Sequence, residues 1–132
     1  MDDVKMPPNP KRCEKGAVAL EFALILPTLL ILVMGIIEFG RAYNTVISLN
    51  GAAREGARVL ALCGTSSPCE GVVEAVENSA VLDLADDAVS EEPCASAGDP
   101  ASVLVDKDFD SLIPYLPFSI TLTGKGTMRC GL

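Results

Sequence analysis

A single carboxylate lies inside a long apolar stretch near the N-terminus. From Ala17 to Ile37 the chain has twenty-one residues, and Glu21 is the only ionisable side chain among them. A charged side chain within a membrane helix costs on the order of 2.5 to 3.5 kcal/mol on insertion scales, so such residues usually mark a function or a hidden partner. In the alternative interpretation, Glu21 lies about one turn from the membrane surface, and its side chain reaches the lipid headgroups.

A cut just upstream would supply a partner for this carboxylate. If the chain is cleaved between Gly16 and Ala17, the new α-amine carries a positive charge at the head of the apolar helix, and Glu21 becomes the fifth residue. The amine of one subunit can then pair with the Glu21 carboxylate of a neighbour, which compensates both charges in an apolar environment. Under this interpretation, Gly16 and Ala17 would flank the cut, and Glu21 would have a role in assembly.

Four cysteines follow the apolar stretch: Cys63, Cys69, Cys94 and Cys130. An even number of cysteines outside the cytoplasm favours disulfides, and four allow three pairings. We favour Cys63 with Cys69, which would join the end of a long helix to the start of a second one. A second bridge, Cys94 with Cys130, would tie the end of the first strand to the C-terminus. A zinc site or a thiol oxidoreductase is disfavoured, because the spacings contain no Cys-x-x-Cys pair.

The composition argues against several classes of function. The net charge is −8, and residues 39–132 carry six bases and thirteen acids, whereas nucleic-acid binding needs clustered Lys and Arg. The chain has no His and no glycine-rich phosphate loop, so we predict no cofactor and no metal. We also predict no enzymatic activity, because the acidic clusters have no positioned base beside them and are interpreted as a solvated rim. These clusters comprise Asp83, Asp86, Asp87, Glu91 and Glu92.

The apolar stretch fits one membrane crossing, since about twenty apolar residues at roughly 1.5 Å each span a bilayer's hydrocarbon core. Three bases and one acid lie just ahead of it at residues 11–15, so the positive-inside rule keeps the N-terminus in the cytoplasm. A cleaved secretory signal is disfavoured, because its apolar core would have only about 7 to 15 residues. Pro27 predicts a kink or a loosened turn. We expect a cytoplasmic leader at 1–16, a transmembrane helix at 17–37 and an extracytoplasmic domain at 38–132.

The periodicity beyond Ile37 predicts that the helix continues to about Leu62. Small and apolar residues recur at steps of four and three, in a stripe formed by Ala42, Val46, Leu49, Ala53, Gly56 and Leu60. This stripe either packs on the protein's own sheet or forms subunit contacts along a filament. Arg54, Glu55 and Arg58 lie largely elsewhere on the helix and indicate a solvated face or an interface ion pair.

The remaining sequence predicts a short helix followed by three strands. The helix is expected at residues 70–84, with its apolar face formed by Val73, Val76, Ala80 and Leu84. Strands are expected at 88–94, 102–109 and 119–128, and the first suits only an edge because its end is acidic and contains proline. The apolar loop at 112–118 either tucks over the sheet or contacts a partner. The predicted fold class is α+β, in which the long helix and the short helix pack against a three-stranded antiparallel sheet.

The features near the N-terminus form one longer pattern. A basic leader ends in Gly16, four apolar residues follow, and Glu21 comes next, as in the class III signals of type IV pilins and pseudopilins. Residues 22–27, 35–41 and 52–58 extend the match. Together these segments resemble the TadE-like family of tight-adherence (Flp-type) pilus assembly proteins.

This resemblance implies a minor pilin or pseudopilin, not an enzyme. It implies cleavage by a prepilin peptidase after Gly16, a pilin-like fold and a single-pass location in the bacterial cytoplasmic (inner) membrane. The implied partners are other pilin or pseudopilin subunits, the pilus assembly platform and the lipid bilayer. The alternative is an uncleaved single-pass membrane scaffold whose outer domain binds other pilus or envelope components. That alternative predicts an intact leader from Met1 and a tolerated Glu21→Ala change.

Overall fold

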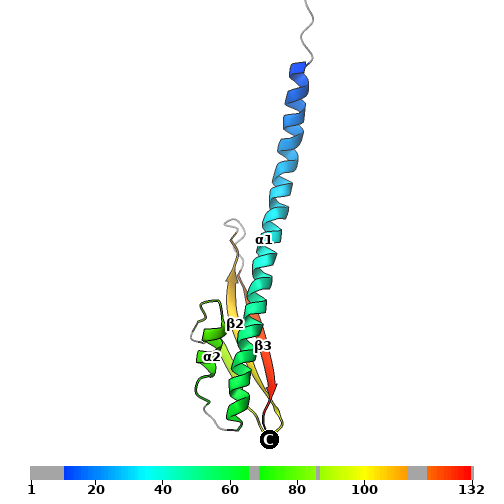
Figure 1. Ribbon diagram of the computed structural model, residues 1–132. Coiled ribbons are helices and arrows are strands. Elements are labelled where there is room, and N and C mark those ends of the chain that lie inside the picture. Colours follow the sequence, from blue (N-terminus) through cyan, green and yellow to red (C-terminus); the bar gives the residue numbers. More distant parts are fainter. Residues whose placement is uncertain (1–10, 66–68, 86, 113–118, 132) are drawn as a thin grey trace, which may run out of the picture. The chain divides into compact units, whose positions relative to one another are not determined.

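The protein was analysed as a computed structural model in which one long helix is followed by a second helix and three strands (Figure 1). The chain divides into two compact units, the first ending at Ile37 and the second beginning at Glu38. Side chains are described from Gly16 onward. The structure describes the backbone over residues 11–65, 69–85, 87–112 and 119–131.

Helix α1 runs from Lys11 to Cys63, which confirms the prediction of a helix that continues far beyond the apolar stretch. The helix continues through Pro27. Before Glu38 the large apolar side chains of α1 are exposed, and Ile31, for example, is 74% exposed. From Glu38 onward one face of the helix is buried within the second unit. The described side chains of α1 before Glu38 have no such buried face.

Helix α2 covers Val72–Ser79, so the prediction of a helix over 70–84 was wrong at both ends. The backbone becomes extended at Ala80, whose N–H donates the last helical hydrogen bond to the Val76 carbonyl at 2.8 Å. Asn78 and Ser79 explain this early end, because their side chains compete for backbone hydrogen bonds and are poor helix formers.

The predicted apolar face of α2 was also partly wrong. Val72 and Val76 are fully buried, whereas Val73 is 41% exposed. Ala80 and Leu84 pack partly buried against the core, but both lie beyond the helix. In so short a helix, the surfaces that it packs against determine which residues are buried. The predicted window included residues outside the helix, and these changed which side of the helix the apolar pattern indicated as buried.

The three strands form an antiparallel sheet in the order β1-β2-β3, which confirms the α+β prediction. Their bounds are Val89–Glu92 for β1, Pro100–Asp110 for β2 and Ser119–Arg129 for β3. Strand β1 is a four-residue edge strand, as its acidic composition indicated. Alternate residues of β2 point into the core, so the strand buries Ala101, Val103, Val105 and Phe109.

Helix α1 lies unusually close to β3, because the strand presents two glycines to it. A Cβ atom added at Gly124 would overlap the backbone carbonyl of Leu49, and one added at Gly126 would overlap the backbone of Ala53. Asn50 adds a polar contact, since its Oδ1 atom accepts the Lys125 N–H at 3.0 Å. Glycine in a strand often marks such a close approach of two backbones.

The small-residue stripe of α1 therefore packs on the protein's own sheet and on α2. Leu49, Ala53 and Leu60 are buried in the core, and Ala42 and Val46 are half-buried. Gly56 faces α2, where an added Cβ would lie 2.5 Å from Cγ2 of Val76. Of the two interpretations of the stripe, the intramolecular one is confirmed. The apolar loop predicted at 112–118 lies outside the described residues after Leu112.

Candidate processing and assembly segment

Gly16, Ala17 and Glu21 all lie within α1. All three are exposed, and a Cβ atom added at Gly16 would meet nothing within 4 Å. Ala17 and Glu21 are four residues apart, so they lie on the same face of the helix, separated by about 6 Å along its axis. Glu21 has no hydrogen-bond or ion-pair partner among the side chains that the structure describes. Its carboxylate is thus accessible to a charged group of another molecule.

The apolar part of α1 is long and apolar enough to cross a membrane by length and composition. Its side chains project outward, and Val18, Leu24 and Ile36 are each more than 60% exposed. An exposed apolar surface of this length is unfavourable in water, and a bilayer would cover it. The helix therefore fits a membrane anchor.

A second carboxylate, Glu38, stands where the second unit begins, and it is only 8% exposed. Its Oε2 atom accepts a hydrogen bond from Nη1 of Arg41 at 2.8 Å. Its Oε1 atom accepts one from the Ser111 hydroxyl at 3.2 Å and another from the Leu112 backbone N–H. We call these four residues the Glu38 clasp. The clasp ties the end of β2 to α1 and satisfies a buried charge on both oxygens.

Arg41 extends the clasp toward the sheet. Its guanidinium carbon lies 4.9 Å from the centroid of the Phe109 ring, within the range of a cation–π interaction. Sequence reasoning did not assign a role to Glu38 or Arg41. Their spacing of three residues on a helix was the only local signal, because the partners Ser111 and Leu112, just after β2, are more than 70 residues away in the chain.

The four cysteines that follow the apolar stretch lie in two pairs at disulfide distance. The Cα atoms of Cys63 and Cys69 are 5.9 Å apart, and those of Cys94 and Cys130 are 6.3 Å apart. Both values fall within the usual range for disulfides. The first pair joins the end of α1 to the segment before α2, and the second joins the chain after β1 to the chain after β3. These are the two pairs that the sequence favoured.

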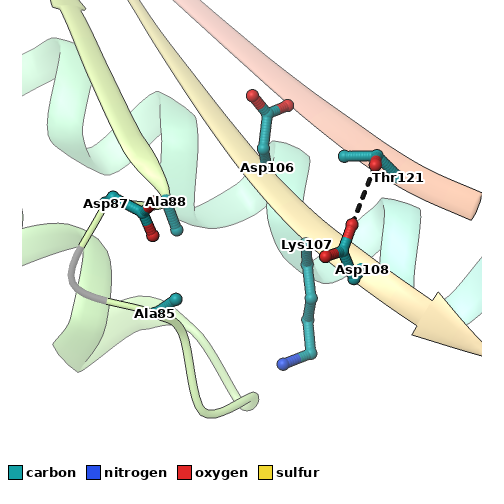
Figure 2. A pocket seen from close by; sticks show the side chains of 7 residues that line it. All are labelled: Ala85, Asp87, Ala88, Asp106, Lys107, Asp108 and Thr121. Atoms are coloured by element: carbon teal, nitrogen blue, oxygen red, sulfur yellow. Dashed lines mark hydrogen bonds between the residues drawn. The ribbon is translucent and has the colours of Figure 1, made fainter.

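The acidic residues considered for catalysis do not form one site. A hollow of about 370 Å³ lies beside β2, and Figure 2 shows its lining of Ala85, Asp87, Ala88, Asp106, Lys107, Asp108 and Thr121. Three of its four charged side chains have hydrogen-bond partners: Asp108 accepts from Thr121 at 2.8 Å, Asp106 accepts from Thr123, and Lys107 donates to the Asp83 carbonyl. Asp87 reaches the hollow, whereas Glu91 and Glu92 lie on β1.

Metal ligation also finds no support in the described part of the chain, where no three His, Cys, Asp or Glu side chains are grouped to hold an ion. Glu92 instead accepts a hydrogen bond from the Ser102 hydroxyl of the neighbouring strand. Of the acidic clusters, Asp86 lies outside the described residues, and Asp83, Glu91 and Glu92 are exposed.

A family model described as TadE-like protein matches residues 16–58. The match confirms the resemblance to the TadE-like family over this segment. The matched segment begins at Gly16 and includes Glu21, Glu38 and Arg41. No match is found among curated proteins or among solved structures.

Proposed function

We propose that this chain is a membrane-anchored minor pilin or pseudopilin that takes part in assembling a tight-adherence (Flp-type) pilus. The match of residues 16–58 to the TadE-like family carries the proposal. The exposed apolar part of α1 supports it, because a helix of that length and composition fits a membrane anchor. In this proposal the N-terminus lies in the cytoplasm, and the unit from Glu38 onward lies outside it.

Processing at Gly16 creates the group that Glu21 requires. A prepilin peptidase hydrolyses the Gly16–Ala17 peptide bond, which leaves a carboxylate on the leader and a free α-amine on Ala17. The protonated amine of one subunit pairs with the Glu21 carboxylate of its neighbour inside the apolar helical bundle. Removing one partner of a buried ion pair costs about 3 to 5 kcal/mol, because it leaves an uncompensated charge. Glu21 thereby favours the alignment of two neighbouring helices in which the α-amine of one subunit lies beside the Glu21 carboxylate of the other.

In this proposal, disulfides stabilise the second unit outside the cytoplasm. After the membrane segment, about 95 residues remain for a folded domain, which is near the lower limit for a self-sufficient core. Two disulfides compensate for this small core in an oxidising compartment. They form between Cys63 and Cys69 and between Cys94 and Cys130, whose distances already suit them.

The intact mass of the protein, purified from cells with and without the matching prepilin peptidase, tests the proposal. We expect a chain that begins at Ala17 when the peptidase is present and a chain that retains residues 1–16 when it is absent. Gly16→Leu should block cleavage, because a large side chain occupies the position before the cut. Gly35→Leu is a matched control, since a Cβ atom meets nothing within 4 Å at either glycine.

A chain that retains Met1 to Gly16 in the presence of the active peptidase would contradict processing. Together with a tolerated Glu21→Ala change, that result would instead support the uncleaved membrane scaffold whose outer domain binds other pilus or envelope components.

A further inference from the structure

The first turns of α1 after Glu38 expose large aromatic side chains. Phe39 is 74% exposed and Tyr43 is 61% exposed, and they lie four residues apart on one side of the helix. Their rings are stacked, with centroids 6.5 Å apart and an angle of 10° between the ring planes. Together they present one aromatic surface, to which Tyr43 adds a hydroxyl group.

The Glu38 clasp brings a third apolar side chain to the same level of the helix. Leu112 is 56% exposed, and its backbone N–H donates to the Glu38 carboxylate. The Ser111 hydroxyl donates to the same oxygen, and Phe109 lies under the Arg41 guanidinium. The end of β2 is therefore held beside the first turn of the second unit.

The position of Phe39, Tyr43 and Leu112 near the apolar stretch indicates what can cover their side chains. Glu38 directly follows the apolar stretch that ends at Ile37, and both belong to the continuous helix α1, so no linker separates the clasp from that stretch. A headgroup layer is roughly 5 to 7 Å thick on each side of the hydrocarbon core. Tyr43 lies five residues beyond Glu38, which is about 7.5 Å of helix. Phe39 falls at the depth of the headgroups, as does Leu112 through its hydrogen bond to Glu38. Tyr43 lies at the outer edge of that layer, and its side chain inclines back toward the helix N-terminus.

We propose that Phe39, Tyr43 and Leu112 insert into the lipid headgroup layer, and that Glu38 is the positioning residue that holds Leu112 there. The proposal rests on the membrane anchoring in the proposed function. Aromatic side chains favour this layer because it accommodates an apolar ring and a polar edge together. Arg41 suits the same place, since its partly exposed guanidinium, which lies over the Phe109 ring, can also meet lipid phosphates. The folded unit thus rests directly on the bilayer, and leaving the membrane during assembly would expose these side chains.

Tryptophan fluorescence in vesicles tests this contact, because the protein has no tryptophan of its own. Single variants Phe39→Trp, Tyr43→Trp and Leu112→Trp would be placed in the full chain and reconstituted into phosphatidylcholine vesicles. The lipid would carry bromine either near the headgroup or deep in the acyl chain. We expect a blue-shifted emission and stronger quenching by the shallow bromine for all three variants. Val81→Trp, at a position that is 90% exposed, is the control that should remain unquenched and red-shifted.

A deep probe separates this inference from the proposed function. Ile31→Trp lies in the middle of the candidate span and should be quenched by the deep bromine. Absence of that quenching would refute the membrane anchoring itself. Quenching of Ile31→Trp together with an unquenched, water-exposed Leu112→Trp would overturn the headgroup contact alone. A blue-shifted but unquenched Leu112→Trp would also overturn it, because a protein surface, such as a second copy, would then cover the site.

Variants of Glu38 test its role as the positioning residue. Glu38→Ala removes the acceptor for the Leu112 N–H, so quenching of Leu112→Trp should be lost while that of Phe39→Trp persists. Glu38→Gln keeps a carbonyl oxygen as acceptor and should restore the quenching of Leu112→Trp. Equal quenching of Leu112→Trp in all three backgrounds would overturn the role of Glu38. The circular dichroism of each variant shows whether the chain is still folded.

Discussion

The close approach of α1 to β3 makes Gly126 a sensitive position. In Gly126→Ala the new methyl group would occupy the space of the Ala53 backbone and of the Arg54 nitrogen. Backbone atoms in the middle of a helix cannot rotate away as a side chain can, so α1 and β3 must separate. Overpacking a core costs typically 1 to 3 kcal/mol and occasionally more. Because the clash is with backbone, we expect the upper end, about 3 kcal/mol.

Such a loss is large for a unit of this size. Domains are stable by roughly 0.05 to 0.15 kcal/mol per residue, which gives about 5 to 14 kcal/mol for the 95 residues from Glu38 onward. Gly51→Ala is a matched control on the opposed helix, since Gly51 is exposed and an added Cβ meets nothing within 4 Å. It should stabilise the protein by about 0.8 to 1 kcal/mol, because alanine is the better helix former.

Amide hydrogen exchange of β3 in the detergent-solubilised full chain measures both effects. A loss of about 3 kcal/mol corresponds to roughly a hundredfold lower protection for amides that exchange through global unfolding. Gly51→Ala should raise the protection of the same amides. If Gly126→Ala leaves the protection of β3 unchanged, then α1 and β3 do not approach as closely as the structure shows, and the reasoning is refuted.

Three further perturbations have expected outcomes. Glu21→Gln should reduce the amount of pilus sheared from cells, since it removes the counter-charge of the α-amine, whereas Glu55→Gln should not, and equal loss in both would contradict a specific role for Glu21. Replacing the Cys94 bridge should destabilise the unit by about 1.6 kcal/mol more than replacing the Cys63 bridge, because it closes 36 residues against 6, and thermal unfolding of the two serine variants compares them. Glu38→Ala should cost about 1 to 3 kcal/mol by leaving the Leu112 N–H unsatisfied, and a melting temperature equal to that of Glu55→Ala would refute this.

Local sequence was sufficient for the features that depend on neighbours in the chain. The candidate membrane helix is evident from twenty-one residues with one ionisable side chain. The continuation of the helix beyond Ile37 is evident from small and apolar residues at helical spacing. The strands predicted at 102–109 and 119–128 agree with β2 and β3 to within two residues at each end. The pattern of Gly16 and Glu21 pointed to the TadE-like family, which the family model matches over residues 16–58. In each case the signal is a short period or a short spacing, which the sequence carries directly.

Tertiary structure decided the features whose partners are distant in the chain. The sequence did not show that Glu38 would be buried, because its Oε1 atom accepts from Ser111 and Leu112, which are distant in the chain. It also did not show that β3 needs Gly126, because the backbone that an added Cβ would overlap belongs to Ala53 and Arg54 on α1. The end and the buried face of α2 were misjudged for the same reason. Local propensities for a helix of eight residues are weak, so packing on α1 and the sheet selects the valines that are buried. A periodic pattern reports which face is apolar, but only the folded chain determines which surface that face meets and how closely.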